Sequence, residues 1–476
     1  MSEHEVVDAQ GGTGGPVSGV VAGVVGVIGA GTMGAGIAQL ACRAGARTLL
    51  HDPIPQALER GAQSVKEGLQ KEAAKGRLSA EQAQTAAARL ETVDSLEQMA
   101  PCELVIEAAP ERLELKHELY RRLSEVVGEE CVLATNTSSL PVTAIAAAAS
   151  HPERVVGMHF FNPAPVMRLL EVIAGVRSGE SALSLATATG EAMGKTTIRA
   201  TDGPGFLVNR CNRPFGLEAL RLLQERIADV PTIDRVVRLG GGFRMGPFEL
   251  SDLVGVDTGF DVARSFYELG FGEPRWRPSP IQARQVAAGL HGRKSGRGYY
   301  DYSGEGPYRP ADPDPPPRTA DAIVTGEGPV TEALRSLAAG REGPRIEVEG
   351  LGGTVEGEPF YAIVPLTLVE VTGDAGEAAF RGLGLHTERV RPVPAGVLAR
   401  IVCQVINESA FALGEGVGSA RDIDTGMVLG MAHPRGPIAW AREIGVEHVL
   451  GVLDDLWGHY REERYRPAPA LRGRAL

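Results

Sequence analysis

The sequence predicts a doubly wound α/β domain followed by all-helical domains. Short apolar stretches alternate with helical patterns over about the first 200 residues, which is typical of a mostly parallel sheet with helices on both faces. From Pro204 onward, helical patterns and glycine turns largely replace the strand signals. In the later part of the chain, residues 395–450 repeat residues 205–260, which predicts two copies of one helical unit.

Each element of the first domain is expected from a local pattern. Helical composition or periodicity predicts helices at 33–44 and 113–127 and one long helical excursion over 55–90. Apolar runs predict buried strands at 24–28, 48–50, 104–108, 132–135, 155–160 and 169–173. After a Pro-rich stretch, further strands are expected near 346–348 and 361–371.

The repeat keeps one offset throughout. Glu218 and Asp234 correspond to Glu408 and Asp424, each 190 residues later. We therefore expect the two helical copies to pack on each other within one chain. The expected division is a flexible leader (1–22), a nucleotide-binding domain (23–203), a first helical copy (204–302), a Pro-rich linker (303–320), a small irregular α/β segment (321–393) and a second helical copy (394–476).

Composition limits the classes of partner. The 476 residues are enough for several domains, and 43% hydrophobic with 23% charged residues is ordinary for a globular protein. The net charge of −12 argues against nucleic acid or an anionic membrane as a general partner. The apolar run 20–30 is interrupted by glycine and too short to span a bilayer. Five scattered cysteines without CxxC spacing predict a cytoplasmic protein with no metal or disulfide framework.

A glycine-rich loop follows the first expected strand. Gly29, Gly31 and Gly34 have the GxGxxG spacing between a strand and a helix, with Thr32 and Met33 inside the motif. The glycines allow a tight turn and a close approach of the backbone to a pyrophosphate, and the helix N-terminus supplies N–H groups. The loop therefore predicts a Rossmann-like dinucleotide site.

Asp52 indicates which dinucleotide binds. It lies 18 residues after Gly34 at the end of the second expected strand, where a carboxylate binds a ribose 2′-hydroxyl and would repel a 2′-phosphate. No Arg follows immediately, so NAD is favoured over NADP. FAD stays open because flavoenzymes share this fingerprint, and a Gly-rich turn with a capping Asp is the purely structural alternative.

Four polar side chains downstream predict alcohol oxidation. His159 lies 12 residues before Glu171, and a His that takes a proton needs a carboxylate to fix its tautomer and stabilise the imidazolium. Ser138 follows an expected strand end and Asn209 begins the helical region, so both can hold the reacting oxygen or a neighbouring carbonyl. Each residue alone also has an ordinary structural explanation, but their combination on one nucleotide-binding scaffold favours catalysis.

These segments resemble the L-3-hydroxyacyl-CoA dehydrogenase family. The matching motifs are GVIGAGTMGAGIAQ, ATNTSSLP, GMHFFNPAPVMRLLEVI, DGPGFLVNR, GGGFRMGPFELSDLVGVD and GRKSGRGYYDY, which cover residues 24–302 almost continuously. The later segments VINESAFALGEGV, DIDTGMVLGMAHPRGPIAW and HYREERYRPAPALRGRAL are similar to the tandem form of the family, which occurs in bacterial 3-hydroxyadipyl-CoA dehydrogenases of phenylacetate breakdown and in related 3-hydroxybutyryl-CoA enzymes.

The resemblance implies NAD-dependent oxidation of a (3S)-3-hydroxyacyl-CoA to the 3-oxoacyl-CoA. It also puts Lys75 near the CoA phosphates, where a solvated helix lysine is the competing interpretation. The active-site residues that it implies are Ser138, His159, Glu171 and Asn209. The NAD contacts that it implies are the glycine loop, Asp52, Glu111, Lys116, Asn162 and Lys294.

The second helical copy departs from the first at the asparagine. The offset from Asn209 leads to Ala399 or Arg400, and no GxGxxG loop precedes this copy. We therefore predict one active site per chain, with the second copy replacing the dimer contact that short family members make. Further homo-oligomerisation stays open.

Arg213 is the candidate for recognising the acyl chain. It lies four residues after Asn209, so both side chains share one face if the segment is helical. An adipyl chain ends in a carboxylate, which Arg binds bidentately. A structural ion pair is the competing explanation for this residue.

Two other functions stay open from the sequence alone. A non-catalytic NAD(H)-binding or structural relative would not need the four polar side chains, which are all present. A β-hydroxyacid dehydrogenase of the 6-phosphogluconate type uses a catalytic lysine in the helical domain, where this chain has Asn209.

Overall fold

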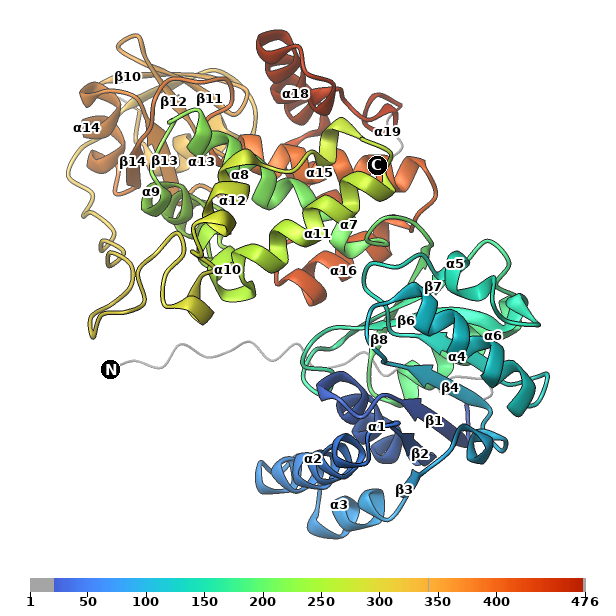
Figure 1. The fold of residues 1–476 in the computed structure, drawn as a ribbon. Helices are drawn as coiled ribbons and strands as arrows, with labels where there is room; N and C mark the ends of the chain where they lie inside the picture. The colour runs from blue at the N-terminus through green and yellow to red at the C-terminus, as the bar shows by residue number, and fades with distance from the viewer. Residues whose placement is uncertain (1–20, 341, 474–476) are drawn as a thin grey trace.

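The computed structural model describes residues 21–340 and 342–473, which form a sheet domain, a helical body and a second, smaller sheet (Figure 1). The predicted leader, residues 1–22, lies outside the described residues except for its last two. Within the described ranges, no helix is long and apolar enough to cross a bilayer.

The first sheet has eight strands in the order β3-β2-β1-β4-β5-β6-β7-β8. Neighbouring strands are parallel except β6 and β7, which are antiparallel. The strands are β1 (Val24–Ile28), β2 (Arg47–His51), β3 (Leu90–Val93), β4 (Leu104–Glu107), β5 (Val132–Thr135), β6 (Val155–Phe160), β7 (Leu169–Ala174) and β8 (Thr196–Thr201). The predicted doubly wound α/β fold is confirmed.

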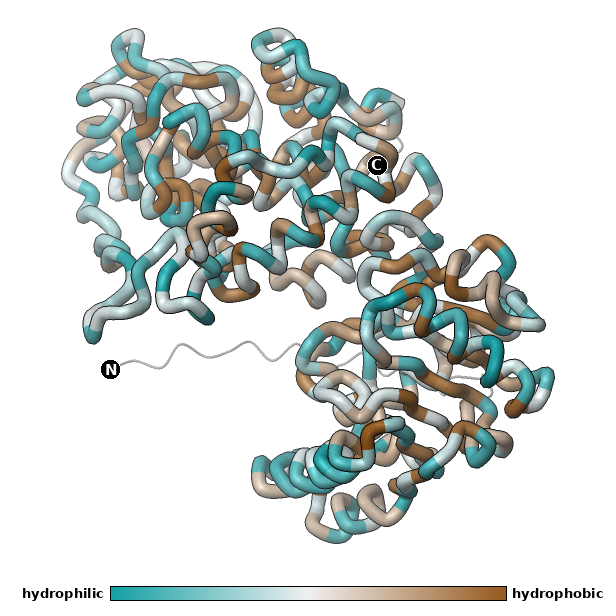
Figure 2. Tube along the Cα trace, in the orientation of Figure 1, coloured by the Kyte–Doolittle hydropathy of each residue, from teal (hydrophilic) through white to brown (hydrophobic). Residues whose placement is uncertain are grey.

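Helices cover both faces of this sheet. They are α1 (Thr32–Ala44), α2 (Pro55–Ala74), α3 (Ala80–Ala87), α4 (Leu113–Val126), α5 (Val142–Ala146) and α6 (Glu180–Ala192). Alternate residues of a strand enter different cores, because side chains of a strand point to opposite faces. In β4, Leu104 and Ile106 join the core that contains α1, whereas Val105 joins the core that contains α4. Figure 2 shows hydrophobic residues in the strands and hydrophilic ones along much of α2.

Two parts of this domain differ from the sequence-based expectation. The segment 55–90 forms α2, α3 and the start of edge strand β3 in place of one long helical excursion, because the chain turns at Gly76 (φ 69°) and Ser79 caps α3. Strand β8 was not expected either. Its sequence TTIRAT has no apolar run, which an edge strand does not need because its outer side is not covered by another strand.

The helical body contains both copies of the repeat. The first copy comprises α7 (Val208–Cys211), α8 (Arg213–Gln224), α9 (Val230–Arg235), α10 (Pro247–Val254), α11 (Val256–Leu269) and α12 (Pro280–Ala287). The second comprises α15 (Leu398–Gly414), α16 (Ala420–Met431), α17 (Pro437–Ile444), α18 (Val446–Tyr460) and α19 (Pro469–Arg472). Asp234 accepts first-turn N–H groups of α10, and Asp424 accepts those of α17 in the same way. The copies therefore share local hydrogen bonding as well as sequence.

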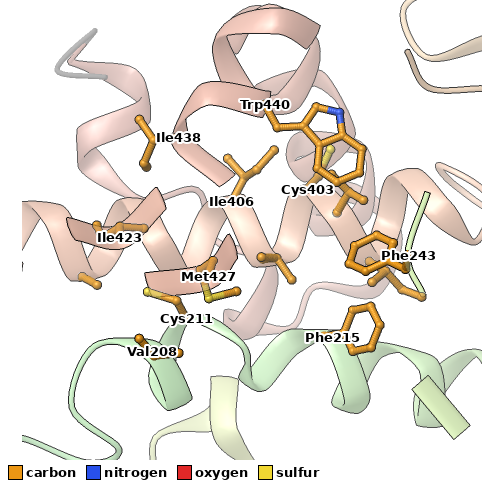
Figure 3. Packing of buried hydrophobic residues seen from close by; sticks show 14 of the residues in the cluster. Val208, Cys211, Phe215, Phe243, Cys403, Ile406, Ile423, Met427, Ile438 and Trp440 are labelled. Carbon is orange, nitrogen blue, oxygen red and sulfur yellow. The ribbon is translucent and has the colours of Figure 1, made fainter. Parts of the chain in front are cut away.

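The two copies pack against each other through apolar side chains (Figure 3). Val208 and Cys211 of α7 and Phe215 of α8 lie opposite Ile406 of α15 and Met427 of α16, and all five belong to one buried cluster. Such an interface inside one chain buries the apolar faces that a single helical copy would expose.

The segment between the copies forms a six-stranded mixed sheet, which is more regular than the irregular α/β segment expected there. Its order is β14-β13-β12-β11-β10-β9, with parallel pairs at both edges and antiparallel pairs between them. The expected strand near 361–371 is two strands, β12 and β13, joined by the loop 362–367. The elements are β9 (Ile323–Thr325), α13 (Pro329–Leu337), β10 (Arg345–Glu349), β11 (Gly352–Val355), β12 (Glu358–Tyr361), β13 (Leu368–Val371), α14 (Asp374–Gly382) and β14 (His386–Arg389).

His433, which follows α16, is expected to make the helical interface sensitive to acid. It is buried against Phe215 and Phe243, its Nε2 lies 2.9 Å from Asn212 Oδ1, and desolvation lowers its pKa to about 3. An unfolded His has a pKa of about 6.5. Between that pH and the lower pKa of the folded state, the unfolded chain binds a proton at this residue that the folded chain does not bind. The free energy of unfolding therefore falls by about 1.4 kcal/mol per pH unit from this residue as the pH decreases. Urea unfolding from pH 7 to pH 4 measures this effect. The free energy of unfolding should depend less steeply on pH in His433→Gln than in wild type, and equal slopes would contradict the expectation.

Candidate active site

The carboxyl ends of the parallel strands bring the predicted site residues to one edge of the first sheet. The glycine loop follows β1, Asp52 follows β2, Ser138 follows β5, and His159 lies near the end of β6. Ligands of open α/β sheets bind at this edge, where the strand order reverses direction. In this sheet the reversal lies between β1 and β4.

The three glycines of the loop have different structural tasks. Gly29 has φ 94°, and a Cβ there would collide with the carbonyl oxygen of Ala108. A Cβ on Gly34 would collide with the carbonyl oxygen of Gly29. At Gly31, by contrast, a Cβ would have no heavy atom within 4 Å, so this backbone is open to a ligand.

The surroundings of the loop fit a dinucleotide. Gly31 is the N-cap of α1 and has no side chain to cap it, which leaves first-turn N–H groups for a phosphate. Thr32 and Met33 lie in that first turn, with Thr32 exposed. Asp52 accepts the N–H of Ala30 at 2.9 Å, so its carboxylate is held next to the loop, where a ribose hydroxyl would lie.

His159 and Glu171 are directly paired neighbours on antiparallel strands β6 and β7. His159 Nδ1 lies 2.6 Å from Glu171 Oε2, and the two residues are 6% and 0% exposed. Because a carboxylate accepts, Nδ1 carries the proton and Nε2 is left as the acceptor nitrogen. The pair therefore has the tautomer that a general base needs.

The second oxygen of Glu171 connects this pair to the helical body. Oε1 accepts the N–H groups of Leu207 and Val208 at 3.2 and 3.0 Å, at the start of α7. Asn209 is the next residue and is partly buried. One buried carboxylate thus orients the histidine and positions the turn that carries the asparagine.

Ser138 lies in a loop organised by Glu111. Glu111 Oε1 accepts N–H groups from Ser138 and Ser139, both at 3.1 Å, and the hydroxyl of Thr137 at 2.5 Å. Desolvation acts to raise the pKa of Glu111, but Lys116 and these hydrogen bonds outweigh it, so the pKa lies below its ordinary value. An ionised Glu111 therefore holds Ser138, which is exposed, at the edge of the sheet.

The remaining residues predicted to contact NAD or CoA have different surroundings. The ammonium of Lys116 is buried between Glu107 (2.6 Å) and Glu111 (3.3 Å), while Asn162 is exposed just beyond β6. Lys75 is the exposed C-cap residue of α2, and Lys294 pairs with Asp257 at the start of α11. Over the described ranges, no hydrogen bond joins Lys75 or Lys294 to His159 or Glu171.

The structure also adds residues that sequence reasoning had not selected. Asn136 accepts the N–H of Phe160 at 2.8 Å and so ties the Ser138 loop to the strand of His159. Glu107 accepts the hydroxyl of Thr135 at 2.8 Å as well as bonding Lys116. The available signal was a polar residue at the end of each of two apolar strands: Glu107 is the last residue of β4, and Asn136 directly follows β5. Across the part of the chain that the structure describes, no group of three His, Cys, Asp or Glu residues could hold a metal.

The second half of the chain contains a matching arrangement with different side chains. Tyr361 pairs with Glu370 across antiparallel strands β12 and β13, as His159 pairs with Glu171. Glu370 accepts the N–H groups at the start of α15, as Glu171 does at α7. The residue after these N–H groups is Ala399. The repeat therefore extends beyond the helical unit, and its second version has a tyrosine and an alanine in place of the histidine and asparagine.

Comparison with known proteins identifies the family. The model of the 3-hydroxyacyl-CoA dehydrogenase NAD-binding domain matches residues 24–203, and that of the C-terminal domain matches residues 205–302 and 397–475. The chain is 38% identical to the 3-hydroxyadipyl-CoA dehydrogenase of Escherichia coli (strain K12), covering 95% of this chain and 97% of that protein. It matches the crystal structure of 3-hydroxybutyryl-CoA dehydrogenase from E. coli K12 with a TM-score of 0.82 and 36% identity, covering 95% of this chain and 98% of the other. The human mitochondrial hydroxyacyl-coenzyme A dehydrogenase is 37% identical over 58% of this chain and 90% of its own length. The chain therefore belongs to the NAD-dependent 3-hydroxyacyl-CoA dehydrogenase family.

Proposed function

We propose that this chain oxidises a (3S)-3-hydroxyacyl-CoA to the 3-oxoacyl-CoA with NAD. The observation that carries the proposal is the buried His159–Glu171 pair, with Nδ1 and Oε2 2.6 Å apart, at the same sheet edge as the glycine loop. When bound, NAD accepts the hydride from the carbon that bears the hydroxyl.

In this proposal the protein moves the proton and holds the substrate. His159 Nε2 takes the hydroxyl proton, and Glu171 stabilises the imidazolium that results. Ser138 and Asn209 donate hydrogen bonds to the reacting oxygen or the thioester carbonyl. The proposed cofactor residues are Gly29, Gly31, Thr32, Met33, Gly34, Asp52, Glu111, Lys116, Asn162 and Lys294. Lys75 is proposed to meet the CoA phosphates.

We propose one active site per chain. Tyr361 cannot take a proton as imidazole does at neutral pH, and Ala399 has no amide to donate. The sequence of the second half also has no GxGxxG loop before its helical copy. The buried free thiols of all five cysteines favour a reducing compartment, and we propose the cytoplasm as the place of action.

The reaction class is tested by mixing the purified protein with NAD and racemic 3-hydroxyadipyl-CoA or 3-hydroxybutyryl-CoA and following the absorbance of NADH. Turnover of either thioester supports the proposal, and the ratio of kcat/KM values identifies the preferred chain. Tight NAD binding without turnover of either substrate would support a binding protein or a dehydrogenase of a different acid.

Arg213 favours a substrate with a distal carboxylate. It is the first residue of α8 and is partly buried, with its guanidinium 4.8 Å from the ring centre of Phe266. The expected alternative, a structural ion pair, is not seen within residues 21–340 and 342–473, and the buried Nε has no hydrogen-bond partner there. Desolvation lowers the pKa of Arg213 to about 10. A guanidinium desolvated without a counter-ion is costly, and an acyl chain that ends in a carboxylate would supply one.

Arg213→Met is therefore expected to lower kcat/KM for 3-hydroxyadipyl-CoA by about 10- to 100-fold, because the loss of a hydrogen bond to a charged group has an effect of about this size. The variant should retain the wild-type kcat/KM for 3-hydroxybutyryl-CoA, which has no carboxylate to lose. Steady-state kinetics with both thioesters measures this difference. An equal loss for both substrates would reject the role of Arg213.

A further inference from the structure

The short helix α7, which carries Asn209, is held at both ends. At its start, Glu171 accepts two backbone N–H groups. Arg210, the residue after Asn209, donates from Nε to Glu408 Oε1 at 2.8 Å. Because a helix of four residues has little stability of its own, these two carboxylates and the buried side chains of Val208 and Cys211 determine where the amide of Asn209 lies.

Glu408 belongs to an ionic cluster in which the first helical copy supplies the arginines and the second supplies Glu408 and Glu415. Glu408 lies within α15, and its side chain and that of Arg210 are 1% and 6% exposed. Arg210 also reaches Glu415 Oε2 at 2.7 Å, and Arg275 Nη1 lies 3.1 Å from Glu408 Oε2. Removing the charge of Glu408 would leave Arg210 with the half-exposed Glu415 as its remaining carboxylate, so the buried guanidinium would shift toward Glu415.

We propose that Glu408 is a positioning residue of the active site, which fixes Arg210 and through it the adjacent Asn209. This inference rests on the proposed function, because it assumes that the amide of Asn209 holds the substrate. The second helical copy then contributes to catalysis without touching the substrate.

The same chain contains a matched cluster that has no asparagine beside it. In the second copy, Arg400 follows Ala399 and donates from Nε to Glu218 Oε2 at 2.9 Å. Its Nη1 donates to Glu225 Oε2 at 2.8 Å. Arg400 differs from Arg210 in that it also donates to the hydroxyls of Tyr460 and Tyr465. The side chains of Arg400 and Glu218 are 0% and 1% exposed, so this pair matches Arg210 and Glu408 in residue types and burial. Glu218 is therefore the internal control for Glu408.

The test compares Glu408→Gln with Glu218→Gln in the full chain. Both variants should lose thermal stability, because each removes the charge of a buried carboxylate that pairs with a buried arginine. Glu408→Gln is expected to lower kcat by about tenfold or more at unchanged KM for NAD, because a small misplacement of a group that holds the substrate is costly. Glu218→Gln should keep a kcat close to that of wild type.

Hydrogen–deuterium exchange supplies a readout that does not depend on activity. Glu408→Gln should speed the exchange of residues 207–211, whereas Glu218→Gln should speed that of residues 397–401. Unchanged exchange at 207–211, or an equal change of kcat in both variants, would overturn the proposal. Wild-type protein that turns over neither thioester would instead refute the proposed function, and the exchange result would still decide whether Glu408 positions α7.

If Glu408→Gln does not fold, a substitution of the half-exposed Glu415 replaces it in the comparison. Glu415→Gln should lower kcat and speed exchange at 207–211 in the same direction but by less, because Arg210 keeps Glu408. Its counterpart is Glu225→Gln, which loosens Arg400. Equal effects of Glu415→Gln and Glu225→Gln on kcat would again overturn the proposal.

Discussion

Replacement of His159 by Gln is expected to lower kcat by a factor of about 10²–10⁴, the usual contribution of a general base. Gln keeps a polar side chain of similar size but takes no proton at neutral pH. The glycine loop and Asp52 are unchanged, so the Kd for NAD should stay close to that of wild type. NADH formation in the steady state and NAD binding by fluorescence measure the two quantities.

Tyr361 provides the control for this substitution. It pairs with Glu370 in the register in which His159 pairs with Glu171, and its hydroxyl bonds the N–H of Val393 at 3.1 Å. Tyr361→Phe should therefore alter stability slightly and leave kcat unchanged. A His159→Gln enzyme with more than about a tenth of the wild-type kcat would mean that another group takes the proton.

Replacement of Glu171 by Gln is expected to lower kcat by about 10³–10⁴, although the side chain keeps its shape. An amide NH₂ facing Nδ1 would donate to it, so the imidazole proton would move to Nε2 and the base would be lost. The loss of a carboxylate that orients a catalytic histidine in a protease has an effect of about this size. The amide oxygen can still accept an N–H group at the start of α7, so the fold should be retained.

A substitution of Glu370 is the control that distinguishes a catalytic effect of Glu171→Gln from a structural one. Glu370 accepts the N–H groups of Val397 and Leu398 at 2.6 and 2.9 Å but has no histidine beside it, and desolvation raises its pKa to about 7. Glu370→Gln should therefore leave kcat unchanged. Comparable losses of kcat in Glu171→Gln and Glu370→Gln would show that Glu171 acts by supporting the fold, and circular dichroism with thermal unfolding would be the accompanying check.

Local patterns were enough to predict most of the first domain and its cofactor loop. Parallel strands buried on both faces must be apolar runs, so β1, β4, β5 and β6 were visible in the sequence. The glycine loop was visible because its task depends on backbone freedom at fixed spacing, as the positive φ of Gly29 illustrates. His159 and Glu171 were also selected from the sequence, because the proposed roles of general base and carboxylate partner restrict both residue types.

The edge strands and the small second sheet were harder to predict. Strands β3 and β8 lie at the edges of the first sheet, where hydrogen bonding to one neighbour replaces the apolar run as the cause of the strand. In the second sheet most strands have four residues, which is too short for periodicity to be read. Tertiary pairing, and not local propensity, decides these elements.

The sequence by itself determined the family, the nucleotide fold, the four candidate catalytic residues and the helical repeat. Each of these depends on residue types at short spacing or on a constant offset. The tertiary structure alone revealed that Tyr361 and Glu370 reproduce the His159–Glu171 pairing and that Arg210 is held by Glu408 of the other copy. Those contacts join residues far apart in the chain, and the long-range packing that brings them together leaves no short-range pattern in the sequence.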